Sequence, residues 1–425
     1  MITNRRKFLQ SLGSATLMLP RVARAAANDR VAIAIVGIRG RGAGLARTFA
    51  TLPDVQITHI CDVNQPLLEP FAKTVAEWTT GPPAMETDLR RVLDNPSVDA
   101  IVVATPDHWH ALATIWGCQA GKHVYVEKPV SHNVFEAQQM VAAARKYQRH
   151  VQTGTQSRSV DHYREAIDLL RNGRIGKVHM AKAWNSQLRR RVEPVADSDV
   201  PDGLNWNMWQ GPAPVKPFNA NRFSYGWRWL WDYGTGDMGN DGVHDLDIAR
   251  WGLGVEIPEA ANCTGDKLVF AGDIQETPDS QYCTFRFPKQ QAMLVYEQRL
   301  WSPYHQEGLE NGVAFYGTDG YMVIGRKSWK MVEKRNNVVF DQSTTFSDTP
   351  HCANFIAAIR HGDALNCDIE EGYRSTLLAH LGNLSFRVGR PLRINPDATE
   401  IVSDAEATLL LRRHGRDEFT IPDVV

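Results

Sequence analysis

The feature that most constrains the fold is the alternation of apolar strands and helical segments between residues 31 and 156. Residues 31–36 form a continuous apolar run, and further strand patterns cover residues 56–62, 99–105, 124–129 and 150–156. Helical patterns, such as residues 45–52 and 134–147, lie between them. Parallel strands require crossover helices and are buried on both faces, so this alternation predicts an α/β fold with a doubly wound parallel sheet.

A glycine-rich turn follows the first strand. Gly37, Gly40 and Gly42 fall between that strand and the first helical pattern. A strand, a glycine turn and a helix in this order are typical of dinucleotide-binding folds, because the pyrophosphate needs close approach to the backbone at a helix N-terminus. If Gly37 and Gly42 are the first and third glycines of the pattern, Arg39 occupies the second position. Arg39 or Arg41 could then contact a phosphate directly.

An acidic residue closes the second strand. Asp62 lies 25 residues after Gly37, where a carboxylate can accept hydrogen bonds from the adenosine ribose. A carboxylate repels a 2′-phosphate, so Asp62 favours NAD over NADP without excluding NADP. The structural alternative for Asp62 is a turn cap.

The next strand ends carry further polar residues. Thr105 and Pro106 begin a turn that leads to His110, which could line the nicotinamide side of a cofactor or cap the following helix. Glu127-Lys128-Pro129 ends the next strand, and Gln156 ends the one after it. A lysine at such a strand end could bind a substrate hydroxyl and lower its pKa as hydride leaves; a surface lysine in a turn is the structural alternative.

The pattern changes after residue 156. A helix is expected at residues 162–172, followed by strands at 178–184, 281–287, 292–298, 313–316 and 321–324. Short connections between several of these strands predict antiparallel pairing. Residues 350–361, 368–388 and 404–413 are predicted helices, and residues 419–425 a tail that packs on the first domain or on a neighbouring subunit. The predicted domains are residues 28–155 and 156–425.

An aromatic segment precedes a glycine-rich stretch with a histidine. Aromatic rings suit the C–H faces of sugars, although most of these rings are expected to pack in the core. The candidate sugar contacts are Trp206, Trp209, Tyr225 and Trp227. The stretch from residue 234 to 251 then places His244 near a helix start, where a neutral imidazole could accept a proton. The arginine run at residues 189–191 is expected to be a solvated loop, with a substrate-facing role as the less favoured alternative.

These motifs, in this order, resemble the Gfo/Idh/MocA oxidoreductase family. The resemblance implies an N-terminal Rossmann domain that binds NAD and a C-terminal α+β domain with an open, mainly antiparallel sheet, whose free face commonly packs on another subunit of a homo-oligomer. It also implies that Lys128 and His244 are catalytic, that Glu127 and Gln156 lie at the cofactor, and that Arg158 could contact the substrate.

One position departs from the family pattern. The family commonly has Asp four residues before the histidine, whereas this chain has Asn240 followed by Asp241. Asparagine cannot relay a proton, so Asp241 or Asp237 could substitute. Alternatively, His244 and Lys128 work without a carboxylate partner.

The N-terminus carries a twin-arginine export pattern. Arg5-Arg6 precedes a short apolar run and a small-residue site near residues 25–27, so residues 1–27 are predicted to be a signal peptide and the protein periplasmic or otherwise extracytoplasmic. This route carries folded proteins, which favours a tightly held cofactor. The six cysteines lack short paired spacings and are expected to be buried, although an oxidising compartment allows a disulfide.

Three functions remain open from the sequence. The first is a nicotinamide-dependent oxidoreductase acting on a sugar hydroxyl or carbonyl. The second is a redox-neutral, NAD-dependent glycoside hydrolase that oxidises, eliminates, hydrates and reduces, and the third is a non-catalytic sugar-binding protein. The formal net charge of −1 argues against a nucleic-acid partner, and neither a membrane span nor a metal site is expected.

Overall fold

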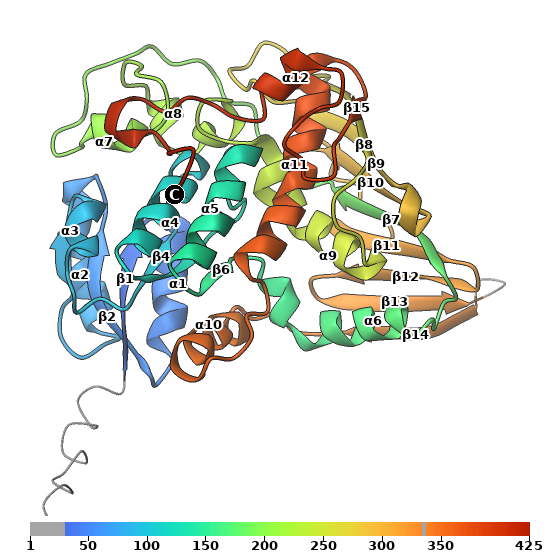
Figure 1. The fold of residues 1–425 in the computed structure, drawn as a ribbon, viewed down its shortest axis with the longest axis horizontal. Helices are drawn as coiled ribbons and strands as arrows, with labels where there is room; N and C mark the ends of the chain where they lie inside the picture. Colours follow the sequence, from blue (N-terminus) through green and yellow to red (C-terminus); the bar gives the residue numbers. More distant parts are fainter. Residues whose placement is uncertain (1–29, 334–336) are drawn as a thin grey trace, which may run out of the picture.

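Figure 1 shows the computed structural model, which describes residues 30–333 and 337–425. Two sheets lie at opposite ends of the molecule, with a layer of helices between them. The predicted export segment, residues 1–27, lies outside the described residues.

The first sheet is entirely parallel and confirms the predicted doubly wound fold. Ile33 and Ile35 belong to one buried cluster and Ala34 and Val36 to another, so β1 is buried on both faces, as parallel strands require. The six strands lie in the order β3-β2-β1-β4-β5-β6. They are β1 (Val31–Val36), β2 (Val55–Cys61), β3 (Ala84–Glu86), β4 (Ala100–Val103), β5 (His123–Val126) and β6 (Val151–Thr153).

Helices cover both faces of this sheet. The helix predicted at residues 45–52 begins earlier, at Gly40, because the glycine turn itself forms the first helical turn. Phe355 of α10, far along the chain, packs 5.9 Å from Tyr125 and 6.4 Å from Phe49 between ring centroids, so α10 belongs to the first core. The helices are α1 (Gly40–Ala50), α2 (Leu68–Ala76), α3 (Leu89–Leu93), α4 (Asp107–Gln119), α5 (Val134–Lys146) and α10 (Thr349–His361).

The second sheet has nine strands in the order β14-β13-β12-β11-β7-β10-β9-β8-β15. Every neighbouring pair is antiparallel except β7 and β10, which confirms the open, mainly antiparallel sheet. The strands are β7 (Val178–Asn185), β8 (Ala260–Asp266), β9 (Ser280–Phe287), β10 (Ala292–Arg299), β11 (Asn311–Gly317), β12 (Gly320–Gly325), β13 (Ser328–Glu333), β14 (Asn337–Ser343) and β15 (Leu392–Arg393). The sequence analysis missed β8, β13, β14 and β15.

Helices α6 (Asp161–Arg171), α9 (Val243–Leu253) and α11 (Ile369–Val388) lie on the inner side of the second sheet, toward the first domain (Figure 1). Helix α9 packs closely on β11: a Cβ added at Gly252 would lie 2.3 Å from the Phe315 ring. The last predicted helix is shorter than expected and spans only Ala405–Leu409 (α12). The tail packs on the first domain, as predicted, with Phe419 5.6 Å from the Trp109 ring of α4.

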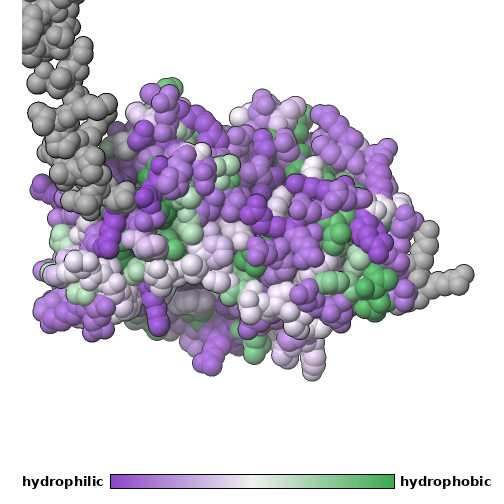
Figure 2. Space-filling view, turned by 90° about the horizontal axis from the view of Figure 1, so that it is seen from below, coloured by the Kyte–Doolittle hydropathy of each residue, from purple (hydrophilic) through white to green (hydrophobic). Residues whose placement is uncertain are grey.

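All six cysteines are buried, as predicted. Cys61, Cys118, Cys352 and Cys367 are free and buried. Cys263 and Cys283 instead form a disulfide between paired residues of β8 and β9. Within the described residues, no helix is long and apolar enough to cross a bilayer. The face shown in Figure 2 is largely hydrophilic, with apolar residues in small separate groups.

Candidate active site

The glycine turn brings β1, β4 and the start of α1 very close together. Gly37 has a φ of +81°, and a Cβ there would lie 2.8 Å from the carbonyl oxygen of Ala104. A Cβ at Gly42 would lie 1.7 Å from the carbonyl oxygen of Gly37. Only glycine fits at either position, and the result is an uncrowded helix N-terminus of the kind that binds a pyrophosphate.

Asp62 follows β2 and lies beside this turn. Its carboxylate accepts hydrogen bonds from the backbone N–H groups of Ile38, at 3.1 Å, and Asn64, at 2.9 Å. Burial raises the pKa of Asp62, and the two N–H donors oppose that shift. The carboxylate therefore caps a turn and also lies at the strand end where a ribose would be bound.

The two arginines of the glycine turn point in different directions. Arg41 forms an ion pair with Glu127, at 2.7 Å, and another with Asp348 just before α10. It therefore links the end of β5 to the start of α10, and two carboxylates hold its guanidinium; its contact with a phosphate stays a prediction. Arg39 is exposed, and its guanidinium lies 5.3 Å from the Phe223 ring centroid.

Polar groups at the ends of β4 and β6 complete the crevice. The His110 ring nitrogens lie 2.9 Å from the Thr105 carbonyl oxygen and 2.7 Å from that of Pro129. His110 therefore holds two strand ends together, and it lies one turn inside α4 rather than at its start. Thr105 Oγ1 and Gln156 Oε1 are buried and have no hydrogen-bond partner in the described parts of the chain, as expected of atoms that serve a ligand.

Lys128 reaches the motif in the second domain. Its Nζ donates to the main-chain carbonyl of Asn240 and lies 3.4 Å from the Asn240 side-chain oxygen. Asn240 belongs to a π-helical turn, η4 (Met238–Gly242), that leads directly into α9. Burial lowers the pKa of Lys128, and Asp241 and Glu127 oppose the shift. The ammonium is therefore a readier proton donor than an ordinary lysine.

His244 is the second residue of α9, which confirms its predicted place near a helix start. Its Nδ1 is buried without a hydrogen-bond partner among the residues that the structure describes. Burial lowers the pKa of His244 well below 6.5, and the positive charge of Lys128 lowers it further. The imidazole is therefore neutral at pH 7 and able to accept a proton. The structure thus places Lys128 and His244, from two distant segments, on the same turn of backbone and within electrostatic reach of each other.

The carboxylates of the motif are held by arginine. Arg189 binds Asp237 at 2.7 Å and also contacts Asp241. Asn240 Nδ2 donates to Asp237 at 3.1 Å. The described hydrogen bonds and ion pairs join neither carboxylate to His244. At the position of the family aspartate, Asn240 instead contributes its main-chain carbonyl to Lys128.

Arg189 is a site residue to which the sequence analysis gave only the less favoured role. Its side chain is only 12% exposed, so the expectation of a solvated loop is wrong at this position. A run of three arginines has no periodicity that distinguishes an inward-facing residue from its neighbours. Asp107 was not singled out; it is buried and accepts a 2.9 Å hydrogen bond from Thr235, joining α4 to the histidine motif.

Most of the candidate sugar contacts pack in the core. Trp206 and Trp209 stack 4.6 Å apart within a buried cluster that also contains Trp227, so the structure contradicts a substrate-facing role for the first two. Trp227 is buried on one side but stacks against Arg228. Tyr225 is 49% exposed, and its hydroxyl lies 3.3 Å from Arg189, so it remains a candidate.

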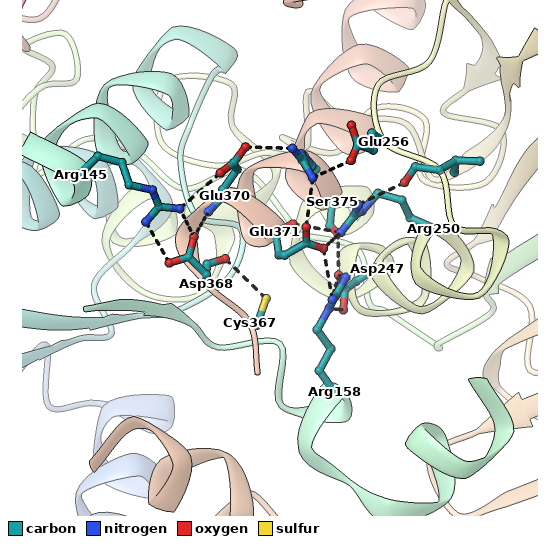
Figure 3. Close-up of polar contacts among 12 residues, drawn as sticks. Arg145, Arg158, Asp247, Arg250, Glu256, Cys367, Asp368, Glu370, Glu371 and Ser375 are labelled. Carbon is teal, nitrogen blue, oxygen red and sulfur yellow. Dashed lines mark hydrogen bonds and ion pairs between the residues drawn. The ribbon is translucent and has the colours of Figure 1, made fainter. Parts of the chain in front are cut away.

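Arg158 also lies outside the open site. Figure 3 shows its side chain meeting Asp247 of α9 and Glu371 of α11, within a chain of ion pairs that includes Arg250. The Arg158 side chain is 5% exposed and that of Asp247 0%. These contacts contradict the prediction that Arg158 binds the substrate.

Comparison with known proteins agrees with this architecture. The model of the GFO_IDH_MocA oxidoreductase family, NAD-binding Rossmann fold, matches residues 31–155. The model of the C-terminal alpha/beta domain of the same family matches residues 178–262 and 328–421. Together the two models cover more than half of the chain.

Individual relatives are more distant. The uncharacterized oxidoreductase YrbE of Bacillus subtilis is 23% identical over 384 residues, which is 86% of this chain and 97% of that protein. A glycosyl hydrolase family 109 protein of Saccharopolyspora erythraea is 34% identical over 128 residues, which is 29% of this chain and 28% of that protein.

A solved structure shares the fold. The WlbA dehydrogenase of Bordetella pertussis, in complex with NADH and UDP-GlcNAcA, superposes with a TM-score of 0.67 at 18% identity, covering 86% of this chain and 99% of that chain. The glycine turn, Asp62 and the matched NAD-binding domain identify NAD as the cofactor of an NAD-dependent dehydrogenase. The chain belongs to the Gfo/Idh/MocA oxidoreductase family.

Proposed function

We propose that this protein transfers hydride between a sugar hydroxyl or carbonyl and a tightly held NAD. The observation that carries the proposal is the convergence of Lys128 and His244 on the turn at residues 238–242. An ammonium and a neutral imidazole that reach the same substrate oxygen can bind that oxygen and take its proton. That chemistry is what the oxidation of an alcohol requires.

Each group has a distinct role in the proposed reaction. NAD, when bound, supplies the hydride acceptor, and Gly37, Gly42 and Asp62 would hold it. His244 accepts the proton of the substrate hydroxyl, because its ring is neutral. Lys128 donates a hydrogen bond to the same oxygen and stabilises negative charge on it. Its anchor on the Asn240 carbonyl fixes the position of Nζ relative to α9.

A sugar is the substrate class that the surroundings support. Tyr225 presents an exposed ring beside Arg189 at the site, which suits a C–H face flanked by hydroxyl groups. The similar dehydrogenase from Bordetella pertussis was crystallised with UDP-GlcNAcA, and a relative is named as a glycosyl hydrolase.

Nicotinamide absorbance during incubation with a panel of sugars tests this function. The proposal requires a change in absorbance with at least one sugar and its loss in the Lys128→Met variant. Release of an aglycone with deuterium exchange at C2 and no net cofactor reduction would instead indicate redox-neutral hydrolysis. Sugar binding without turnover, unaffected by replacing Lys128 or His244, would indicate a binding protein.

We also propose that the protein is exported by the twin-arginine route and acts in the periplasm. The Arg5-Arg6 pattern supports export, and the Cys263–Cys283 disulfide suits an oxidising compartment. Replacing Arg5 and Arg6 together by Lys should leave the protein in the cytoplasmic fraction. Periplasmic recovery of that variant would contradict the twin-arginine route.

We further propose a homo-oligomer formed through the second sheet. The face opposite α9 carries a small cluster of Trp184, Ala314 and Val323, with Tyr316 and Tyr321 only partly buried beside it. Figure 1 shows the helices of this domain on the other face. Sedimentation should give a mass larger than one chain, and replacing Tyr316 and Tyr321 by Lys should reduce it; a monomeric wild type would rule the proposal out.

A further inference from the structure

Arg228 is a second arginine beside Tyr225. Aromatic rings hold it in place, whereas carboxylates hold Arg189. Arg228 lies in the short helical turn η3 (Gly226–Trp229). Its guanidinium carbon is 4.1 Å from the Tyr225 ring centroid and 4.3 Å from that of Trp227. Two aromatic rings therefore fix the plane of the guanidinium, which lowers the entropy lost when that group binds a ligand.

No carboxylate among the described residues forms an ion pair with Arg228. Its one hydrogen bond within the described residues runs from Nη1 to the Tyr225 carbonyl, at 3.2 Å, and it takes part in none of the ion pairs found among those residues. Its remaining nitrogens are not among the buried atoms that lack partners, so they are open to solvent. Arg228 thus keeps most of its donors free, whereas Arg189 is paired with two carboxylates.

The charge of Arg228 reaches Lys128, one of the two proposed catalytic groups. That charge lowers the pKa of Lys128, and the pKa of Arg228 itself is lowered by burial, with Asp107 and Asp237 opposing. Asp237 is already bound by Arg189, and Asp107 already accepts from Thr235. An anionic ligand group would therefore compensate a charge that the protein leaves uncompensated.

We propose that the substrate is an acidic sugar whose carboxylate binds Arg228 while Lys128 and His244 act on a hydroxyl of the same molecule. This inference rests on the proposed sugar oxidoreductase function and names its substrate class. The planar fork of a guanidinium matches a carboxylate with two parallel hydrogen bonds. A neutral hydroxyl would leave the charge of Arg228 without a partner.

Equilibrium binding to the NADH-loaded protein tests the proposal without turnover. Calorimetric titrations compare glucuronate with glucose and galacturonate with galactose. At low ionic strength at least one acid should bind about 10- to 100-fold more tightly than its neutral partner, as expected for a charge-assisted bidentate contact. Raising the salt concentration should reduce this preference.

Variants assign the preference to Arg228. Arg228→Gln should remove most of the preference for the acid and change the affinity for the neutral sugar by less than about threefold. Arg228→Lys, which keeps the charge but not the fork, should retain part of it. Arg222→Gln is the matched control, because Arg222 lies in the same segment but is paired with Asp197. Thermal unfolding midpoints of all variants report whether the fold is kept.

Several results would overturn the acidic-sugar assignment. These are equal affinity of the wild type for acid and neutral sugars, binding of neither, a preference unchanged in Arg228→Gln, or an equal loss in Arg222→Gln. Tighter binding of glucose 6-phosphate than of both acids would also overturn it. Turnover of neutral sugars with no acid preference would leave the oxidoreductase function intact, whereas an Arg228-dependent acid preference without any hydride transfer would contradict that function alone.

Discussion

His244 obtains its reactivity from its position at the start of α9. Burial and the nearby Lys128 charge keep its ring neutral, because both lower the pKa of the imidazole below 6.5. Lys128 in turn is held by the Asn240 carbonyl, four residues before His244. The two side chains are thus positioned by a single turn of backbone.

Replacing His244 by Asn should reduce kcat by about 100-fold or more, because a general base is lost while the local hydrogen-bonding shape is kept. The affinity for NAD should change by less than about threefold. His361→Asn, at the exposed end of α10, is the control. Steady-state kinetics and nucleotide binding check this, and a fully active His244→Asn variant would exclude the proposed base.

His244 should also determine how kcat depends on pH on the acidic side. Since the folded pKa of His244 is well below 6.5, the base should remain neutral as the pH falls through 6.5. We therefore expect kcat to stay nearly constant between pH 7.5 and 6.5 and to decline only at lower pH. A half-maximal rate at pH 6.5 or above would mean that His244 is not the group that titrates.

Asp62 should determine which dinucleotide binds. Asp62→Ala removes a carboxylate from the end of β2, so NAD should bind about 10- to 100-fold more weakly. NADP should gain affinity, because the repulsion of its 2′-phosphate is removed. Nucleotide titrations followed by fluorescence measure both changes. An unchanged NAD affinity would show that Asp62 acts only as the turn cap that also binds Ile38 and Asn64.

At the scale of elements, the buried ion pair of Arg158 and Asp247 joins η2 (Gln156–Ser159), where the first domain ends, to α9. Glu371 and Ser375 extend the contact to α11 (Figure 3). This ion-pair network therefore anchors α9, the helix that carries His244, to the end of the first domain and to α11. The position of α9 depends on this network as well as on apolar packing.

Removing one partner of this pair should be costly. Asp247→Ala leaves Arg158 without its buried partner, so the free energy of unfolding should fall by about 3–5 kcal/mol. The double variant Arg158→Met with Asp247→Leu should recover much of that loss, because neither charge then remains buried alone. Urea unfolding measures both. Equal stability of Asp247→Ala and wild type would contradict the structural role assigned to Arg158.

Sequence patterns predicted the elements that bury continuous apolar runs. Strands β1, β2, β9 and β10 lie within one residue of their expected bounds, because their apolar patterns were unambiguous. Strand β14 was missed because its side chains are mostly exposed and it pairs only at the edge of the sheet. The start of α1 was predicted too late, because the start of the helix contains three glycines and glycine has a low helix propensity.

Site residues could likewise be predicted only where a local sequence pattern marks them. Lys128 and His244 could be predicted because each ends or begins an element with a recognisable motif. Arg189 and Arg228 could not, because both come from the irregular segment between β7 and η4, where only tertiary contacts decide which side chains face inward.

At the scale of the whole molecule, several histidines are buried in the neutral form. Burial lowers the pKa of each, to about 3 for His108 and His380, to about 4 for His351, and well below the usual value for His132 and His244. Asp245 has the opposite shift, because burial raises its pKa to about 8.

These shifts predict that the fold weakens on acidification. A histidine with a lowered folded pKa contributes stability that is present above pH 6.5 and is lost as the pH falls toward that folded pKa. Each adds up to about 1.36 kcal/mol per pH unit to the slope. Asp245 has the opposite effect on stability: its contribution is present below its unfolded pKa and is lost as the pH rises toward 8. The combined effect of the five histidines is expected to exceed that of this one carboxyl group.

We therefore expect the free energy of unfolding to fall between pH 6.5 and 4.5. Denaturant titrations across this range measure the slope. His380→Gln should make the slope shallower, whereas His361→Gln, at an exposed position, should not. Stability that is constant or rises over this interval would show that the buried histidines do not control the acid response.

The central claim is that Lys128 and His244 act together at one bound nicotinamide. A crystal structure of the protein with NAD tests it most directly. The account predicts a dinucleotide along the Gly37–Gly42 turn, with its ribose at Asp62 and its nicotinamide ring next to both Lys128 Nζ and the His244 imidazole. A nicotinamide that lies away from either side chain would contradict it.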